Sequence, residues 1–186
     1  MDIQKLDQTY VANTYARFPV TIVKGKGSLL WDENGKEYID LSTGIAVDIF
    51  GVADESWMAA VTAQLGTLQH ISNLFYTGPC AELAQMLCEK TGMKKVFFGN
   101  SGAEANESAI KTARKWSEDK KGKEYSTIIT LKNSFHGRTI TTLAATGQDV
   151  YHHDFLPLTE GFVYAEPNDI ADLEKLLNEN KCAAVM

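Results

Sequence analysis

The second half of the chain alternates short apolar strands with helices, and this alternation restricts the possible folds more than any other feature of the sequence. Strands are expected at residues 94–98, 126–131, 161–165 and 182–186, and helices between them at 102–120, 139–145 and 168–177. Alternation at this spacing is typical of right-handed crossovers and a parallel sheet. The predicted fold class is therefore α/β, with a largely parallel sheet that has helices on both faces.

The first part of the chain has a different pattern. Residues 20–41 read as a short antiparallel meander, in which Asn34 and Gly35 are expected to supply the positive φ angles of a tight turn. Helical periodicity follows at residues 55–68 and 81–90. The sequence therefore adds a small antiparallel segment to the α/β fold.

These patterns predict two domains. Residues 1–54 would form an N-terminal segment that belongs to a small domain, and residues 55–186 the first part of a large α/β domain. The last predicted strand, CAAVM, would leave a sheet edge open at the end of the chain. We therefore expect either a fragment truncated at residue 186 or an edge that another chain covers.

Composition excludes several classes of partner. The net charge of −6 comes from 24 acidic and 18 basic residues, and no basic block predicts binding to nucleic acid or to an anionic membrane. No apolar run approaches the roughly 20 residues of a membrane span, and the N-terminus lacks the apolar core of a signal peptide. We expect a cytoplasmic protein. Three widely spaced cysteines favour reduced thiols in the core over a disulfide framework or a metal site: Cys80, Cys88 and Cys182.

The segment FFGNSGAEANESAIKTARKW predicts a helix whose first turn can hold an anion. Ser101 and Glu104 have the spacing of a capping box, which places the helix start at Gly102. The amides of Gly102, Ala103 and Glu104 would then lack partners inside the helix, at the positive end of its dipole. Capping alone explains the pattern about as well as phosphate binding does. The motif matches neither a P-loop nor a dinucleotide fingerprint.

A second loop, NSFHGRT, follows the next predicted strand, so it should lie at the same sheet edge. Phe135 could be core, or could cover the face of a planar ligand. Arg138 could be a solvated charge, or could hold a carboxylate through two hydrogen bonds. His136 alone is more often structural than catalytic. Together the two loops suit a phosphorylated aromatic cofactor and an amino-acid substrate.

Four segments in this order resemble the class III, pyridoxal-phosphate-dependent aminotransferases, and among them the acetylornithine type. They are FPVTIVKGKGSLLWDENGKEYIDLSTGIAV, HISNLFYT, NSGAEANESAIKTAR and FHGRT, and the resemblance extends from about residue 9 to residue 186. It implies an incomplete fold type I transferase with pyridoxal 5'-phosphate as cofactor. The implied cofactor-binding residues are Ser101, Gly102 and Ala103 at the phosphate, Phe135 on the pyridine ring, and His136.

The resemblance also implies substrate contacts and a reaction. Arg138 would receive the substrate's α-carboxylate, and Tyr15 matches a substrate-contacting tyrosine. Gly44 stands where ornithine-specific members tend to carry a tyrosine, which weakly favours an acetylated donor. The implied reaction is a ping-pong transamination that moves the δ-amino group of N-acetylornithine to 2-oxoglutarate, as in arginine biosynthesis. A homodimer is expected of the full-length enzyme.

The sequence departs from the family pattern in two places. The segment FGVADESW keeps Gly51 but lacks the family's Gly-His-x-His-Pro. The family's Schiff-base lysine, and the aspartate that pairs with the pyridine nitrogen, fall beyond residue 186, so no catalytic residue is assigned and the chain alone is expected to be inactive. Lys111 and Lys115 are interpreted as solvated.

Three alternatives stay open at this point. The donor could be ornithine, succinylornithine, 4-aminobutyrate or a related ω-amino acid. The chain could be a non-catalytic domain that binds a phosphate ligand or nucleotide at the same helix start. It could also be an inactive partner subunit.

Overall fold

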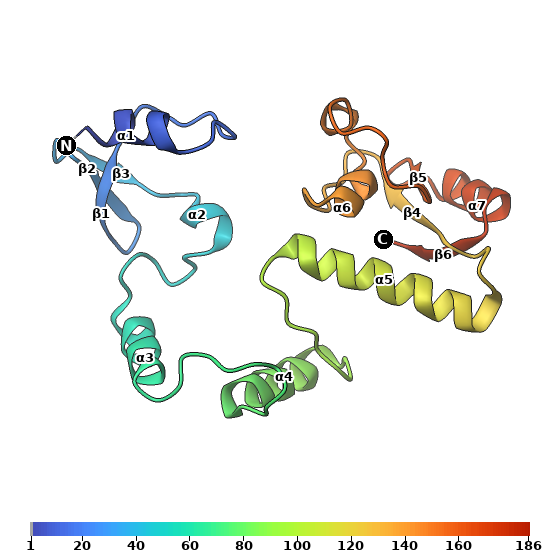
Figure 1. The fold of residues 1–186 in the computed structure, drawn as a ribbon, viewed down its shortest axis with the longest axis horizontal. Helices are drawn as coiled ribbons and strands as arrows, with labels where there is room; N and C mark the ends of the chain where they lie inside the picture. Colours follow the sequence, from blue (N-terminus) through green and yellow to red (C-terminus); the bar gives the residue numbers. More distant parts are fainter. Residues whose placement is uncertain (1) are drawn as a thin grey trace. The chain divides into compact units, whose positions relative to one another are not determined.

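The computed structural model describes residues 2–186, and the chain divides into two compact units, Met1–Thr77 and Gly78–Met186. The first unit contains α1 (Ile3–Tyr10), β1 (Ile22–Lys26), β2 (Leu29–Asp32), β3 (Glu37–Ile39), α2 (Thr43–Ala46) and α3 (Glu55–Leu65) (Figure 1). The second contains α4 (Gly78–Thr91), α5 (Gly102–Lys121), β4 (Thr127–Leu131), α6 (Ile140–Ala145), the 3₁₀ turn η1 (Asp149–Tyr151), β5 (Phe162–Ala165), α7 (Ile170–Glu179) and β6 (Cys182–Val185). The predicted domain boundary at residue 54 stays a prediction.

The first unit contains the predicted antiparallel meander, with strand order β1-β2-β3. The carboxylate of Asp32 organises its turn, because it accepts hydrogen bonds from the backbone amides of Asn34 and Lys36, each at 2.9 Å. Gly35 has a φ of 81°, but Asn34 does not have a positive φ. The prediction for Asn34 was wrong, because the hydrogen bonds to Asp32 fix a turn in which only the glycine needs the left-handed region.

The segment at α2 is a left-handed turn rather than a regular helix. Its φ angles are 49° at Thr43, 65° at Gly44, 62° at Ile45 and 60° at Ala46. This region costs roughly 1–2 kcal/mol for each residue that carries a Cβ, so only the glycine fits it freely. The carboxylate of Asp40 compensates in part by accepting from the amides of Ser42 and Thr43, each at 2.9 Å.

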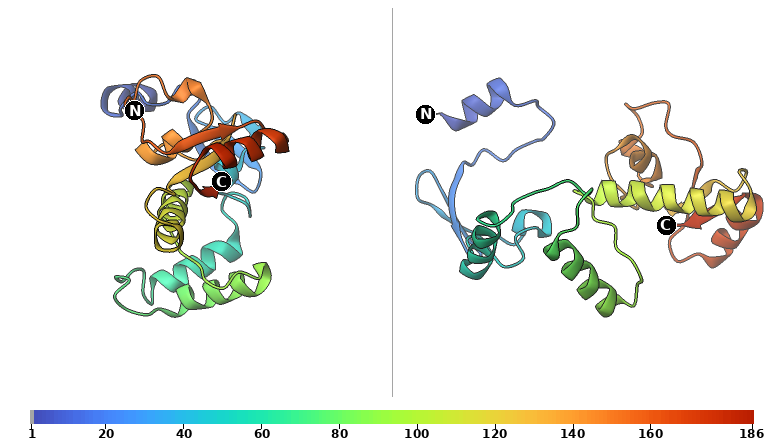
Figure 2. Two further views of the ribbon diagram at one scale, coloured as in Figure 1. Left: turned by 90° about the vertical axis from the view of Figure 1, so that its right-hand side faces the viewer. Right: turned by 60° about the horizontal axis from the view of Figure 1, so that its bottom comes forward.

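The second unit contains a parallel sheet in the order β5-β4-β6, which confirms the predicted fold class. The central strand β4 is the most buried, because it pairs with β5 on one side and with β6 on the other; Ile128, Ile129 and Thr130 are at most 1% exposed. Helix α5 packs against β6 and helix α7 against β5. Figure 2 shows α5 in two further views as one continuous helix. A small core forms where Ile110 of α5 meets Ile128 and Ala145.

Several predictions for this unit were wrong. Residues 94–98 do not form a strand, because no described strand offers them a hydrogen-bonding partner. The cysteines are free, as predicted, but they are not core residues: Cys80 is exposed, and Cys88 and Cys182 are half-buried.

Across residues 2–186, no helix is both long enough and apolar enough to span a bilayer. The same residues contain no group of three or more potential metal ligands.

Candidate functional site

The start of α5 has the open backbone that the sequence predicts. Ser101 is extended, and its Oγ accepts a hydrogen bond from the amide of Glu104 at 3.1 Å. Within residues 2–186, the amides of Gly102 and Ala103 donate to no other group. A Cβ built on Gly102 would meet no heavy atom within 4 Å. Two amides at the positive end of a 20-residue helix are therefore free to bind an anion.

The capping box differs in detail from the prediction. The carboxylate of Glu104 accepts from the amide of Asn100, one residue before the N-cap. The amide of Glu104 is itself occupied by Ser101, so the prediction that it is open was wrong. The cap therefore leaves two free amides rather than three.

The loop at residues 133–139 is hydrogen-bonded directly to the first turns of α5. Asn106 donates from Nδ2 to the carbonyl of His136 at 2.8 Å, and Thr139 donates from Oγ1 to Glu107 at 2.5 Å. Gly137, with a φ of 137°, lies so close that a Cβ there would be 2.8 Å from the Cβ of Ala103. The two sequence motifs thus lie side by side, as predicted.

The same loop is tied to α6 and to the segment that follows it. The amide of His136 donates to Thr146 Oγ1 at 2.9 Å. The amide of Gly147 donates to Ser134 Oγ at 3.2 Å, and Gln148 donates from Nε2 to the carbonyl of Ser134 at 3.0 Å. Hydrogen bonds that involve side chains on both sides therefore fix the loop in one position.

The ring of His136 lies in the interior of this arrangement. Its Nε2 is buried and has no hydrogen-bond partner among residues 2–186. Burial lowers the pKa of the imidazole, so the neutral ring is favoured. A buried, neutral imidazole agrees with the structural role that the sequence favours for His136. Its role in cofactor binding stays a prediction.

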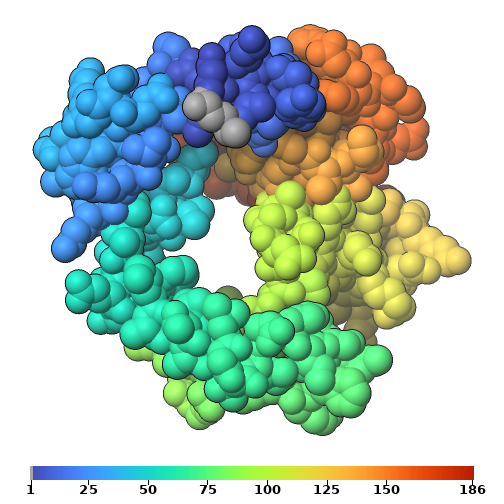
Figure 3. All heavy atoms as spheres, turned by 60° about the vertical axis from the view of Figure 1, so that its left-hand side comes forward, coloured from blue at the N-terminus to red at the C-terminus, as the bar shows by residue number. Residues whose placement is uncertain are grey.

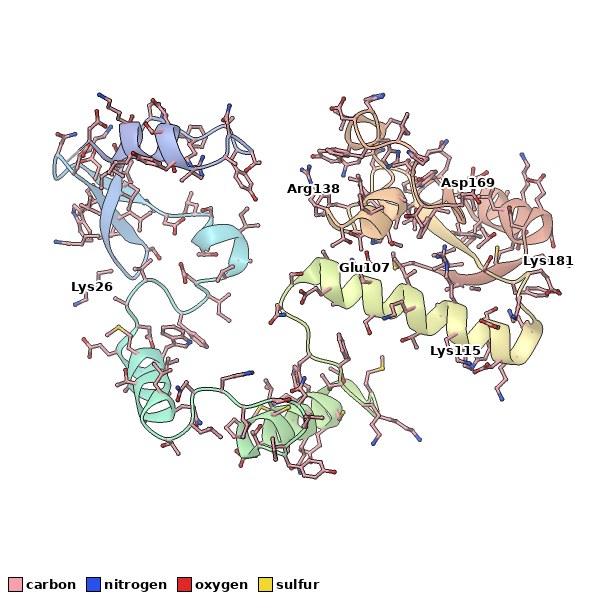
Figure 4. The ribbon with its side chains drawn as sticks, viewed as in Figure 1. Lys26, Glu107, Lys115, Arg138, Asp169 and Lys181 are labelled. Carbon is pink, nitrogen blue, oxygen red and sulfur yellow. The ribbon has the colours of Figure 1, made fainter. Side chains whose placement is uncertain are left out.

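Arg138 lies against two aromatic rings. Its Cζ is 4.1 Å from the centroid of the Tyr151 ring and 5.6 Å from that of Phe135, and the two rings meet edge to face with centroids 6.2 Å apart. Phe135 is 55% exposed, so one side of its ring remains available to a ligand. Among the described residues, Arg138 forms no ion pair. Figure 4 shows Arg138 beside α6 and Glu107 near the beginning of α5.

Sequence reasoning missed Tyr151. It lies 13 residues after Arg138, in a segment, GQDVY, that has no motif and no clear periodicity. A second aromatic residue close behind the FHGR loop is the only signal that could have pointed to it.

The remaining predicted residues are exposed. Tyr15, in the first unit, is 73% exposed and lines a cavity of about 310 Å³ with Asp7 and Arg17. Lys111 and Lys115 are exposed on α5, as predicted. The surface around the beginning of α5, in yellow-green, is visible in the space-filling view (Figure 3).

Comparisons with known proteins agree with the sequence motifs. Residues 10–186 match the family described as Aminotransferase class-III. The acetylornithine aminotransferase of Haemophilus ducreyi is 51% identical over 99% of this chain and 47% of its own length. The chain therefore spans about half the length of the curated relatives it matches.

Solved structures agree with the fold. The ornithine aminotransferase of Toxoplasma gondii, whose structure shows partial occupancy of PLP at the active site, matches 99% of this chain and 44% of its own with a TM-score of 0.91 and 33% identity. The acetylornithine aminotransferase of Elizabethkingia anophelis matches 98% of this chain and 42% of its own with a TM-score of 0.79 and 30% identity. The family match, the relatives and the fold lead to one conclusion: the chain belongs to the class III aminotransferases, a family of pyridoxal-phosphate enzymes.

Proposed function

We propose that this chain contributes three binding elements to an aminotransferase that moves the δ-amino group of N-acetylornithine to 2-oxoglutarate. They are the phosphate seat, formed by the amides of Gly102 and Ala103, the ring-stacking surface of Phe135, and the carboxylate clamp, which is the guanidinium of Arg138. The observation that carries the proposal is the pair of free amides at Gly102 and Ala103, fastened to the loop that presents Phe135 and Arg138. The proposed enzyme is a cytoplasmic homodimer that acts in arginine biosynthesis.

The residues present fit pyridoxal 5'-phosphate. A phosphate at the start of α5 would receive hydrogen bonds from the amides of Gly102 and Ala103 and from the hydroxyl of Ser101. Charge-assisted hydrogen bonds contribute about 1.5–3 kcal/mol each, and the helix dipole adds about 0.3–2 kcal/mol. The space beside Gly102 admits a bulky oxyanion, since no described atom fills it.

The neighbouring loop would orient the rest of the cofactor and the substrate. Phe135 would cover one face of the pyridine ring, and Arg138 would hold the substrate's α-carboxylate through two hydrogen bonds. By the family resemblance, Tyr15 would also contact the substrate. When bound, the cofactor supplies the electron sink that transamination requires. The roles of these residues are to bind and to orient, and no proton transfer is assigned to them.

The choice of amino donor rests on the relatives. The acetylornithine aminotransferases of Haemophilus ducreyi and Wolinella succinogenes are 51% and 48% identical to this chain, whereas the ornithine aminotransferase of Toxoplasma gondii is 33% identical. The identities to these two curated relatives support N-acetylornithine as the donor. Among solved structures, identity does not separate the two donors, because the acetylornithine aminotransferase of Elizabethkingia anophelis is 30% identical to this chain.

The test of the donor is an assay of an enzyme that carries this sequence together with the second half present in the relatives. We expect faster turnover of N-acetylornithine with 2-oxoglutarate than of ornithine or succinylornithine. Faster turnover of 4-aminobutyrate would overturn the choice of donor but keep the aminotransferase class.

The test of the phosphate seat uses Gly102→Ala. The fold should tolerate it, because the new Cβ meets no neighbour, while the methyl group obstructs the phosphate. We expect weaker binding of pyridoxamine 5'-phosphate, a probe that cannot react with surface lysines. Unchanged binding, or tighter binding of ATP than of this probe, would favour a non-catalytic nucleotide-binding domain.

A further inference from the structure

We propose that Tyr151 is a positioning residue that holds the guanidinium of Arg138 ready for the substrate's carboxylate. The proposal deepens the proposed function and rests on it, because it takes Arg138 as the carboxylate clamp. It assigns a role to the segment after α6, where the sequence shows no motif.

Aromatic rings surround the guanidinium of Arg138. Its Cζ lies 4.1 Å from the centroid of the Tyr151 ring, well inside the roughly 6 Å range of a cation–π contact. Phe135 lies farther from it, at 5.6 Å. Among residues 2–186, Arg138 donates no hydrogen bond and pairs with no carboxylate, so aromatic contacts are what hold it.

A cation–π contact is compatible with the hydrogen bonds that a carboxylate clamp needs. The N–H groups of a guanidinium lie in its plane, so an aromatic ring over its face leaves the donors free at the edge. A carboxylate can then bind along that edge in two parallel hydrogen bonds while the ring contact persists. In the proposed arrangement the Tyr151 ring lies over that face, where it restricts the motion of Arg138 without competing for its donors.

Hydrogen bonds anchor the segment that carries Tyr151. Its amide donates to the carbonyl of Gln148 at 3.0 Å, and the Gln148 side chain donates to the carbonyl of Ser134 at 3.0 Å. Ser134 immediately precedes Phe135. The segment that carries Tyr151 is thus fixed to the loop that carries Phe135 and Arg138, and the ring is half-buried.

The Tyr151 hydroxyl forms no hydrogen bond within the described part of the chain. The face of the ring is therefore the functional part, and the oxygen is dispensable. The lack of a partner for the hydroxyl distinguishes a cation–π role of Tyr151 from a hydrogen-bonding role, and a matched pair of variants tests the difference. Tyr151→Phe keeps the ring and removes the oxygen, whereas Tyr151→Leu keeps an apolar side chain and removes the ring.

The kinetic test uses the holoenzyme that carries this sequence. We expect Tyr151→Leu to raise the KM of N-acetylornithine and of 2-oxoglutarate by about three- to tenfold, because the clamp is less ordered, with kcat within about twofold. Tyr151→Phe should restore both KM values to nearly the wild-type level. Equal KM values for Tyr151→Leu and the wild type, or Phe as impaired as Leu, would overturn the proposal.

A graded series of fluorinated phenylalanines at position 151 gives a readout that a merely structural role would not move. Fluorination weakens the negative face of the ring with little change in its shape, so the KM values should rise steadily with the number of fluorine atoms. A flat series would overturn the proposal.

A binding measurement separates failure of this inference from failure of the proposed function. Glutarate, a dicarboxylate that cannot be transaminated, is titrated by calorimetry into the wild type, Tyr151→Leu and Arg138→Ala. We expect Tyr151→Leu to weaken binding about three- to tenfold and Arg138→Ala to abolish it. If no amino donor is turned over but this order holds, the donor assignment fails and the role of Tyr151 stands. If Tyr151→Leu binds glutarate as the wild type does, the role of Tyr151 fails.

Discussion

Each of the two units of the chain is stabilised internally by a different kind of interaction. In the first, Asp32 is the one buried residue among those described, and four aspartates fix the local structure by accepting hydrogen bonds from backbone amides: Asp2, Asp32, Asp40 and Asp54. In the second, apolar residues form the core: Ile110, Ile128, Ile129, Leu143, Ala144, Ala145 and Ala165.

This difference explains where the geometry of the candidate site is defined. The loops around Gly102 and Arg138 rest on the packed second unit, and side-chain hydrogen bonds from α5 and α6 fix them. The segment around Tyr15 belongs to the unit whose turns depend on local carboxylate contacts. A binding site has a well-defined geometry where packing and hydrogen bonds hold the same loops in place, and this is the case in the second unit.

The largest difference between the units should appear on truncating a buried side chain. Ile129→Ala, at a residue that is 0% exposed, should lower the free energy of unfolding by about 2–5 kcal/mol through lost burial and a cavity. Ile22→Ala, at a residue that is 44% exposed in the first unit, is the matched control and should cost less than about 1 kcal/mol. Urea denaturation followed by circular dichroism measures both, and equal losses would contradict the contrast.

The close approach of the two site loops should give the next largest effect. Gly137→Ala places a methyl group 2.6 Å from Thr142 Oγ1, and overpacking of this kind costs about 1–3 kcal/mol. Gly35→Ala is its control in the first unit, because Gly35 also has a positive φ but open space around it. Thermal unfolding should therefore show a larger loss for Gly137→Ala. A loss equal to that of the control would mean that only the backbone angle matters.

Helix caps should matter about equally in both units. Asp54 accepts from the amide of Trp57 at 2.8 Å at the beginning of α3, and Ser101 accepts from Glu104 at the beginning of α5. Asp54→Ala and Ser101→Ala should each lower the free energy of unfolding by about 1 kcal/mol. Chemical denaturation tests this, and a far larger loss for Ser101→Ala would show that the cap also supports the packing of α5.

The smallest expected effects are on the pH dependence of stability, which should differ between the two units. Burial lowers the pKa of His136, so the unfolded state binds more protons below the ordinary value of 6.5, and the stability of the second unit falls as the pH drops through this window. Hydrogen bonds from Ser42 and Thr43 lower the pKa of Asp40, so its contribution is complete above the ordinary value of 3.8 and is lost below it.

Tm measured against pH with His136→Gln and Asp40→Asn tests this separation. His136→Gln should flatten the profile just below pH 6.5, and Asp40→Asn should flatten it only below about pH 4. Profiles that change in the same window for both variants would contradict the assignment.

Much of the second unit could be predicted from the sequence because local signals and packing agree there. Ser101 predicts the start of α5, a β-branched run predicts β4, and aromatic and β-branched residues together predict β5. The error at residues 94–98 has a physical reason: apolar periodicity indicates that a segment can pair, but not that a partner strand is present.

Other features of the fold have no sequence signal. Thr43, Ile45 and Ala46 adopt positive φ angles that their side chains disfavour, and the hydrogen bonds of Asp40 that hold this turn depend on geometry. Within the candidate site, Gly102 and Arg138 could be predicted from the sequence motifs. The contact with Tyr151 depends on how the chain returns after α6, which periodicity does not encode.

The most direct test of the account is a titration of the chain with pyridoxamine 5'-phosphate, followed by the backbone amide signals of Gly102 and Ala103 in nuclear magnetic resonance. The account predicts saturable shifts at these two amides. It predicts none at Ile170 and Ala171, where the carboxylate of Asp169 caps the start of α7. Shifts of the same size at both helix starts, or no shift at Gly102 and Ala103, would contradict the claim that the start of α5 is the phosphate seat.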